Sequence, residues 1–137
     1  MADGSGTVYV FPVHTVLVVE DDADSAEALS KALRMSGYKV LSVPNGREAL
    51  ALVILDGVDL VITDLRMPQM DGVTLLTVLR SYLRFRSLPV IVFSAYADGP
   101  NAERLDALGA NEVFTKARTD LAAVVRAVGR HLGPPAP

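Results

Sequence analysis

Four apolar stretches of the sequence are each followed directly by side chains that could take part in one chemical step. These are the acidic run 20–22, the carboxylate of Asp64, the hydroxyl of Ser94 and the ammonium group of Lys116. Carboxylates that lie close together in a partly buried site repel one another unless a cation is bound among them. Oxygen ligands without His or Cys favour a hard cation such as Mg²⁺, which also accepts phosphoryl oxygens. Together these groups predict a phosphoryl-transfer site.

In such a site Asp64 is the expected nucleophile. A bound cation and the ammonium group of Lys116 would both lower the pKa of the Asp64 carboxyl and keep it ionised. The hydroxyl of Ser94 could donate a hydrogen bond to a phosphoryl oxygen. Taken alone, each residue also has a structural explanation, as a turn residue, a strand-end hydroxyl or a solvated charge. The prediction therefore depends on their occurrence together at the ends of separate strands.

The acidic run 20–22 likewise has a structural explanation. Acidic residues after a strand commonly mark the N-terminus of a helix, where they interact with the helix dipole. Asp24 or Ser25 could supply the cap of that helix, so the role of Asp22 stays open. Asp71 and Gly72 are interpreted as a turn and the start of a helix, without a catalytic role.

The elements that must position these side chains alternate between strands and helices. Short apolar stretches without polar alternation are typical of strands covered on both faces. We predict such strands at residues 15–19, 39–43, 59–63, 89–94 and 112–115. Alternation with helices predicts a parallel sheet with right-handed crossovers and helices on both faces. The carboxyl ends of all five strands would then share the edge at which ligands bind.

Apolar residues recur at helical spacing between the predicted strands, which indicates one buried stripe on each helix. The five stripes are Ala26, Leu29 and Leu33; Ala49, Leu50, Val53 and Ile54; Leu75, Leu76, Leu79 and Leu83; Leu105 and Leu108; and Leu121, Val124, Val125, Val128 and Leu132.

Composition excludes several classes of protein. The 137 residues include no Cys, so neither disulfides nor thiolate metal sites can form. The net charge of -3 leaves no broad basic face for nucleic acid, and no apolar run approaches the roughly 18 residues that a membrane span needs. We expect one cytoplasmic domain at 14–132. We further expect an N-terminal extension at 1–13, partly disordered or adding a strand, and a disordered tail at 133–137.

The motifs at the strand ends resemble those of the receiver domain of two-component response regulators. In order and spacing they are "VLVVEDD", "DLVITDLRMPQMDG", "VIVFSA" and "VFTKA". The resemblance covers about Val16 to Leu132. It implies a flavodoxin-like (βα)₅ fold with the strand order 2-1-3-4-5. It also implies that Asp64 accepts a phosphoryl group from a sensor histidine kinase or a histidine phosphotransfer protein, in a signalling domain rather than an enzyme.

The resemblance further implies the role of each residue around Asp64. Glu20 and Asp21 would hold Mg²⁺, or Mn²⁺ in its place, together with Asp64 and the backbone carbonyl of Arg66. Arg66 lies two residues beyond Asp64, and Tyr96 lies two residues beyond Ser94. Both would flank the path of the hydrolytic water. They are therefore expected to modulate the lifetime of the phosphate.

The same family pattern implies a switch. Ser94 corresponds to the switch hydroxyl and Lys116 to the lysine of the family motif. Phosphorylation would draw Ser94 and the loop 95–99 inward. The switch face, defined as Ser94, Ala95 and Val113, would then change and meet a downstream effector protein or domain. The domain is expected to be a monomer or a phosphorylation-dependent homodimer.

Two positions depart from the family pattern. Ala117 follows the lysine where Pro is usual, and Val113 stands where Tyr or Phe is usual, with Phe114 on the opposite strand face. These departures favour an alternative, a pseudo-receiver that acts as a phosphorylation-independent protein-interaction module. A phosphohydrolase with an aspartyl nucleophile is disfavoured, because such enzymes generally carry a second Asp where this chain has Arg66.

Overall fold

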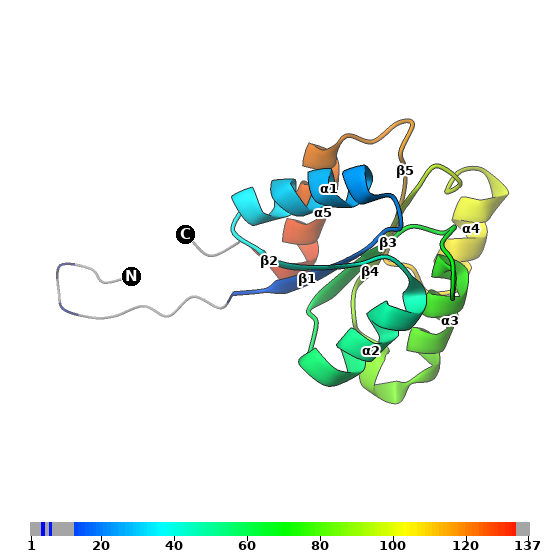
Figure 1. Cartoon of the computed structure of the whole chain (residues 1–137), viewed down its shortest axis with the longest axis horizontal. Helices are drawn as coiled ribbons and strands as arrows, with labels where there is room; N and C mark the ends of the chain where they lie inside the picture. Colours follow the sequence, from blue (N-terminus) through cyan, green and yellow to red (C-terminus); the bar gives the residue numbers. More distant parts are fainter. Residues whose placement is uncertain (1–3, 5, 7–12, 134–137) are drawn as a thin grey trace.

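Five parallel strands form one sheet in the part of the chain that the structure, a computed structural model, describes: residues 4, 6 and 13–133. The order of the strands is β2-β1-β3-β4-β5 (Figure 1). Their bounds are Thr15–Val19 (β1), Lys39–Val43 (β2), Leu60–Thr63 (β3), Val90–Ser94 (β4) and Glu112–Thr115 (β5). The predicted fold class and strand order are confirmed. The third and fourth strands begin one residue later than predicted.

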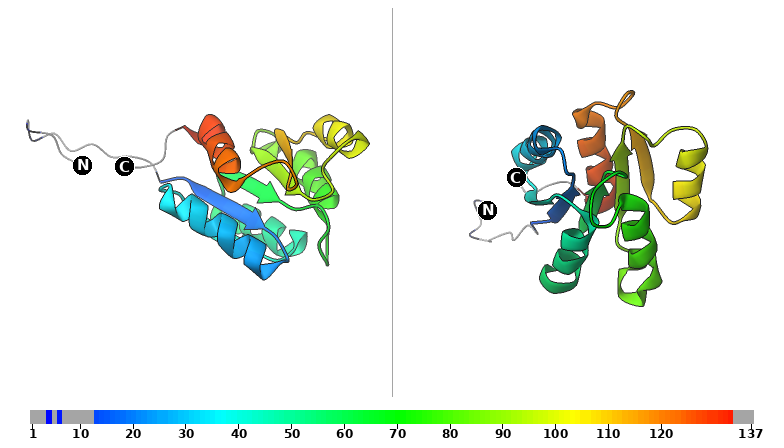
Figure 2. Two further views of the ribbon diagram at one scale, coloured as in Figure 1. Left: turned by 90° about the horizontal axis from the view of Figure 1, so that it is seen from above. Right: turned by 45° about the vertical axis from the view of Figure 1, so that its right-hand side comes forward.

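Helices cover both faces of the sheet (Figures 1 and 2). Their bounds are Ala23–Met35 (α1), Gly46–Asp56 (α2), Gly72–Ser81 (α3), Pro100–Ala107 (α4) and Leu121–Leu132 (α5), with a short 3₁₀ helix, η1, at Leu83–Phe85. Helices α1 and α5 pack on one face, and α2, α3 and α4 pack on the other. No helix among the described residues is long and apolar enough to span a membrane.

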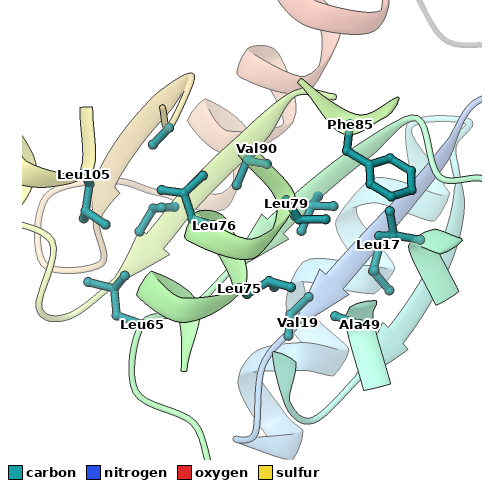
Figure 3. Packing of buried hydrophobic residues seen from close by; sticks show 14 of the residues in the cluster. Leu17, Val19, Ala49, Leu65, Leu75, Leu76, Leu79, Phe85, Val90 and Leu105 are labelled. Carbon is teal, nitrogen blue, oxygen red and sulfur yellow. The ribbon is translucent and has the colours of Figure 1, made fainter. Parts of the chain in front are cut away.

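The sheet separates two apolar clusters because successive side chains of a strand point to opposite faces. In β1, Val16 and Val18 contact the side chains of α1 and α5, whereas Leu17 and Val19 join the cluster formed with α2, α3 and α4 (Figure 3). All four are at most 1% exposed. Burial on both faces explains why the strands read as continuous apolar runs in the sequence.

Two residues of the predicted helical stripes are exposed. Leu83 is 78% exposed because α3 ends at Ser81, and Tyr82 adopts an extended conformation that breaks the helical phase. Ile54 is 37% exposed, since only Ala49 and Val53 of its stripe are fully covered. The prediction that Leu83 and Ile54 belong to the core is therefore wrong.

The start of α1 also differs from the expectation. Neither Asp24 nor Ser25 is the cap. The Asp22 carboxylate accepts hydrogen bonds from the backbone N–H of Ser25 at 3.0 Å and from its hydroxyl at 2.6 Å. These two bonds lower the pKa of Asp22. Asp22 therefore has a structural role. Asp71 caps α3 in the same way, accepting from the N–H of Thr74 at 2.8 Å, as the predicted turn and helix start require.

The predicted terminal segments fall mostly outside the described residues. This holds for the strand expected at 8–13, of which only Val13 is described, and for the tail 133–137, of which only Gly133 is described. Helix α5 ends at Leu132, the residue at which the predicted domain ends.

Candidate functional site

The site lies at the carboxyl edge of the sheet, where backbone hydrogen bonds continue just past the strands. The N–H of Asp64 donates to the carbonyl of Val19 at 3.0 Å, so Asp64 follows β3 beside the end of β1. At the same edge, between the ends of β4 and β5, the N–H of Lys116 donates to the carbonyl of Ser94, also at 3.0 Å. The register of the parallel strands therefore brings together residues that are far apart in the sequence.

Three carboxylates meet at this edge. Glu20, Asp21 and Asp64 each present one oxygen, and these oxygens lie within 4.8 Å of one another. Glu20 is buried, Asp64 is partly buried and Asp21 is exposed. Carboxylates at this separation repel one another strongly where water is partly excluded. The cluster therefore needs positive charge.

Lys116 supplies part of that charge. Its Nζ lies 2.5 Å from Oε1 of Glu20 and 3.3 Å from Oδ2 of Asp64. Burial alone would lower the pKa of Lys116, but the hydrogen bond to Glu20 and the charges of both carboxylates raise it above its usual value. No peptide bond in the described part of the chain is cis, so the bond between Lys116 and Ala117 is trans. The lysine enters the site without the proline that usually follows it.

The two inner carboxyls titrate in opposite directions. Burial, strengthened by the hydrogen bond with Asp64, raises the pKa of Glu20 to about 7, although Lys116 opposes this shift. Burial also acts to raise the pKa of Asp64, but hydrogen bonds from Glu20, from Ser94 and from the backbone N–H of Leu65 hold it below the usual value. The last of these bonds measures 2.6 Å. These opposite directions favour an ionised Asp64 beside a Glu20 that protonates more readily than usual.

The oxygens at the edge fit a hard cation. Oε2 of Glu20 is buried and has no hydrogen-bond partner among the described residues. In the same part of the chain, the backbone carbonyl of Arg66 accepts no hydrogen bond. A set of carboxylate and carbonyl oxygens without nitrogen or sulfur is the ligand set that Mg²⁺ prefers. A divalent ion here would displace the proton from Glu20.

Ser94 is completely buried at the end of β4. Its hydroxyl oxygen accepts a hydrogen bond from the backbone N–H of Tyr96 at 3.2 Å. The hydroxyl therefore links the end of β4 to the loop that follows. Ala95, the next residue of the predicted switch face, is exposed.

Arg66 and Tyr96 contact each other directly. The guanidinium carbon of Arg66 lies 3.6 Å from the centre of the Tyr96 ring, which is the geometry of a cation–π interaction. The carbonyl of Tyr96 also accepts a hydrogen bond from the side-chain amide of Asn101 at 3.0 Å. Both residues line a pocket together with Leu65, which directly follows Asp64. The sequence predicts that Arg66 and Tyr96 lie beside the site, but it does not predict that their side chains stack on each other.

Val113 and Phe114 lie on opposite faces of the sheet, as the alternation along a strand predicts. Val113 packs on the face covered by α3 and α4, whereas Phe114 packs on the face covered by α1 and α5. The position that usually holds an aromatic ring is therefore occupied here by a small aliphatic side chain.

Two residues that position Asp64 are absent from the predicted site. A Cβ atom at Gly72 would lie 2.0 Å from the backbone oxygen of Asp64, so only glycine fits there. The Thr63 hydroxyl donates to the same oxygen at 2.7 Å. The dipeptide Asp71-Gly72 marks a turn in the sequence, but its closeness to Asp64 depends on how the loop folds back.

Comparison with known proteins gives matches along most of the chain. The family model described as the response regulator receiver domain matches residues 16–127. The transcriptional regulatory protein PrrA of Mycobacterium tuberculosis is 34% identical over 120 residues, which cover 86% of this chain and 51% of PrrA. The chain therefore spans about half the length of that relative.

Two solved structures are similar in fold. The receiver domain of a signal transduction histidine kinase from Syntrophus aciditrophicus has a TM-score of 0.80 and 34% identity, covering 88% of this chain and 90% of that one. The receiver domain of the sensor histidine kinase PA1611 from Pseudomonas aeruginosa has a TM-score of 0.79 and 26% identity, covering 89% and 99%. The latter structure has a magnesium ion coordinated in the active site cleft.

Proposed function

The chain belongs to the receiver domain family of response regulators, and we propose that it is a phosphorylation-dependent switch whose phosphoacceptor is Asp64. The donor is a phosphohistidine of a sensor histidine kinase or of a histidine phosphotransfer protein, met in the cytoplasm. The single observation that supports this proposal most is that the carboxylates of Glu20, Asp21 and Asp64 meet within 4.8 Å of one another, with Nζ of Lys116 3.3 Å from Asp64. This arrangement keeps the nucleophile ionised in a partly buried site.

Mg²⁺ is the proposed cofactor, with Mn²⁺ as an alternative ion. Its ligands are Glu20, Asp21, Asp64 and the backbone carbonyl of Arg66. The unpartnered oxygen of Glu20 and the magnesium ion in the PA1611 receiver domain support this assignment. When bound, Mg²⁺ supplies positive charge that offsets the negative charge of the phosphoryl group in the transition state.

Phosphoryl transfer requires mainly positioning from the protein. A carboxylate oxygen of Asp64 attacks phosphorus, the bond from phosphorus to the imidazole nitrogen breaks, and the electron pair stays on that nitrogen. The backbone N–H of Leu65 orients the attacking carboxylate through its 2.6 Å hydrogen bond. The Nζ of Lys116, already 3.3 Å from Asp64, donates to a phosphoryl oxygen as negative charge spreads over the group.

Phosphorylation then changes the loop after β4. In the structure the Ser94 hydroxyl oxygen accepts a hydrogen bond from the N–H of Tyr96, and a phosphoryl oxygen would offer the hydroxyl hydrogen a charged acceptor. Movement of Ser94 toward the phosphate biases a pre-existing equilibrium of Ala95 and Val113, the face that meets an effector protein or a second copy. The stacked pair of Arg66 and Tyr96 limits the access of water and so sets the lifetime of the phosphate.

Replacement of the phosphoacceptor tests this function. Asp64→Asn should abolish phosphate uptake from acetyl phosphate in the presence of Mg²⁺, because an amide is not a nucleophile in this reaction. Asp24→Asn, which changes an exposed acidic residue in the first turn of α1, should leave uptake unchanged. The phosphorylated fraction is measured by intact-protein mass spectrometry. An equal fraction in Asp64→Asn and the wild type would refute the assignment.

A pseudo-receiver is the second candidate, favoured by Ala117 and Val113. Such a module would bind its partner without phosphorylation. Titration with Mg²⁺ and then with beryllofluoride, which imitates the phosphoryl group, distinguishes the two. A switch should show amide chemical-shift changes at Ser94 and Val113, whereas a module without a working site should show none.

A further inference from the structure

Helix α4 begins differently from the other α-helices in the described part of the chain. The side chains of Asp22, Asn45, Asp71 and Asp120 cap α1, α2, α3 and α5, each accepting a hydrogen bond from the backbone N–H three residues on. The residue before α4 is Gly99, with a φ of 57°, and no side chain caps the helix there. A side-chain cap pairs a backbone N–H that the helix itself leaves unpaired. The start of α4 is therefore held less firmly than the starts of the other helices.

The first turn of α4 is also not part of the core. Of the eight residues of this helix (yellow in Figure 1), only Leu105 is buried, and it lies in the second turn. None of residues 100–103 is buried. A segment with little buried surface can change its conformation at a low cost in free energy. The first turn can therefore move while Leu105 stays in place.

The opposite end of α4 is fixed by Arg80 of α3. Its Nε donates to the carbonyl of Gly109 at 3.0 Å, and its Nη2 donates to Oδ1 of Asn111 at 2.9 Å. The same oxygen of Asn111 accepts a hydrogen bond from the backbone N–H of Val90, at the start of β4, at 2.9 Å. The segment that leads from α4 into β5 is thus bonded to both α3 and β4. Movement of α4 is therefore confined to its first turn.

One side chain connects this first turn to the carboxyl edge of the sheet. Nδ2 of Asn101 donates to the carbonyl of Tyr96 at 3.0 Å, and the backbone N–H of Tyr96 donates to Oγ of Ser94 at 3.2 Å. The backbone N–H of Asn101 also donates to the carbonyl of Asp98 at 3.2 Å. Two hydrogen bonds, one on each side of Tyr96, therefore lead from the buried hydroxyl of Ser94 to α4.

We propose that Asn101 is a positioning residue that couples Ser94 to α4, so that the first turn of this helix responds to phosphorylation. This coupling rests on the proposed function of Asp64 as a phosphoacceptor. When the Ser94 hydroxyl turns toward a phosphoryl oxygen, its hydrogen bond with the N–H of Tyr96 changes. The carbonyl of Tyr96 then shifts, and the Asn101 side chain bonded to it carries the first turn along.

Amide chemical shifts test the coupling. Mg²⁺ and then beryllofluoride are added to the full-length protein, and the amides of Ser94 and Ala102 are followed. We expect changes at both amides in the wild type. In Asn101→Ala the change at Ser94 should remain, whereas the change at Ala102 should be at least about twofold smaller, because the connecting side chain is lost.

Two further variants separate the hydrogen bond from the stability of the helix. Asn101→Asp keeps the shape of the side chain but has no N–H donor, and its negative charge favours the N-terminus of a helix. It should therefore show the same loss at Ala102 as Asn101→Ala. Glu103→Ala removes an exposed side chain from the same turn and should respond as the wild type does.

The possible outcomes distinguish a failed coupling from a failed switch. No change at Ser94 in the wild type would refute the proposed switch, and the coupling with it. A change at Ser94 without one at Ala102 in the wild type would overturn the coupling alone. An undiminished response of Ala102 in Asn101→Ala or Asn101→Asp would do the same. An equal loss in Glu103→Ala would also overturn it, because any weakening of the first turn would then suffice.

Discussion

Glu20 and Asp64 are carboxylic acids at the ends of adjacent strands, yet their pKa values move in opposite directions. Burial raises that of Glu20 to about 7. Asp64 is held low despite burial because it accepts hydrogen bonds from Glu20, Ser94 and the N–H of Leu65. At neutral pH and without a metal ion, one carboxyl can therefore hold a proton while its neighbour remains a nucleophile.

This difference predicts how stability depends on pH in protein freed of Mg²⁺ by a chelator. The folded-state pKa of Glu20, about 7, lies above its ordinary value of 4.5. Between these values the folded state binds more protons than the unfolded chain, so this group lowers the free energy of unfolding as the pH rises. The wild type should therefore lose stability relative to Glu20→Gln from about pH 4.5 to about pH 7.

Urea unfolding of both proteins across this range measures the difference. Adding Mg²⁺ should stabilise the wild type more at about pH 8 than at about pH 5, because the ligands must be deprotonated to bind. A stability difference that does not vary with pH would show that folding does not raise the pKa of Glu20.

Lys116 is predicted to matter more for switching than for folding. Lys116→Ala should lengthen the phosphate lifetime and weaken the beryllofluoride-induced shifts at Val113, because the phosphoryl group loses a donor. Its free energy of unfolding should fall by no more than about 1 kcal/mol, since the ion pairs are partly exposed and Glu20 can take up a proton. Lys39→Ala, at an exposed lysine of β2, is the control. A normal switch in Lys116→Ala would remove the lysine from the proposed mechanism.

At the scale of elements, the loop between β3 and α3 decides where Asp64 lies. The N–H of Gly72 donates to the carbonyl of Leu65 at 2.8 Å, which folds the start of α3 back over the end of β3. Asp71 fixes the same point by capping the helix. The turn and the cap therefore position the nucleophile, although neither residue touches the phosphoryl group.

Gly72→Ala should consequently be destabilising. The added Cβ would lie 2.0 Å from the backbone oxygen of Asp64, so the loop must move by a large amount. We expect a loss of about 2–4 kcal/mol in the free energy of unfolding, together with slower phosphorylation. Gly129→Ala is the matched control, because its Cβ would meet only the Tyr38 hydroxyl at 3.6 Å. That change within α5 should stabilise by about 0.5–1 kcal/mol. Equal effects of the two substitutions would contradict the close packing at Gly72.

At the scale of the whole molecule, the sheet separates its carboxyl edge from its amino edge. The carboxyl edge carries Asp64, and a groove lined by Asp59 lies near the amino edge. The central strands between them are buried on both faces. A change at one edge can therefore alter stability without altering the chemistry at the other.

Most of the fold follows from patterns within short segments. Apolar runs predict the strands, and helical spacing predicts the helices, because each pattern records which faces a segment buries. The predictions for Leu83 and Ile54 are wrong for a related reason. Periodicity does not show where a helix ends, and α3 ends before Leu83, with Tyr82 as its C-cap. It also does not show how much of a helix its neighbours cover, which decides the exposure of Ile54.

By itself, the sequence determined where the strands lie along the chain and which residues follow them at one edge, because parallel connections place every strand's carboxyl end there. The order of the strands in the sheet was implied by the resemblance to receiver domains. Only the tertiary structure decided how those residues interact. Glu20 and Lys116 are 96 positions apart and form an ion pair, and Arg66 stacks on Tyr96. The choice of which carboxyl holds the proton depends on burial and on distances of a few ångströms between groups from different strands. Such distances are set by the packing of the whole domain, which no local pattern encodes.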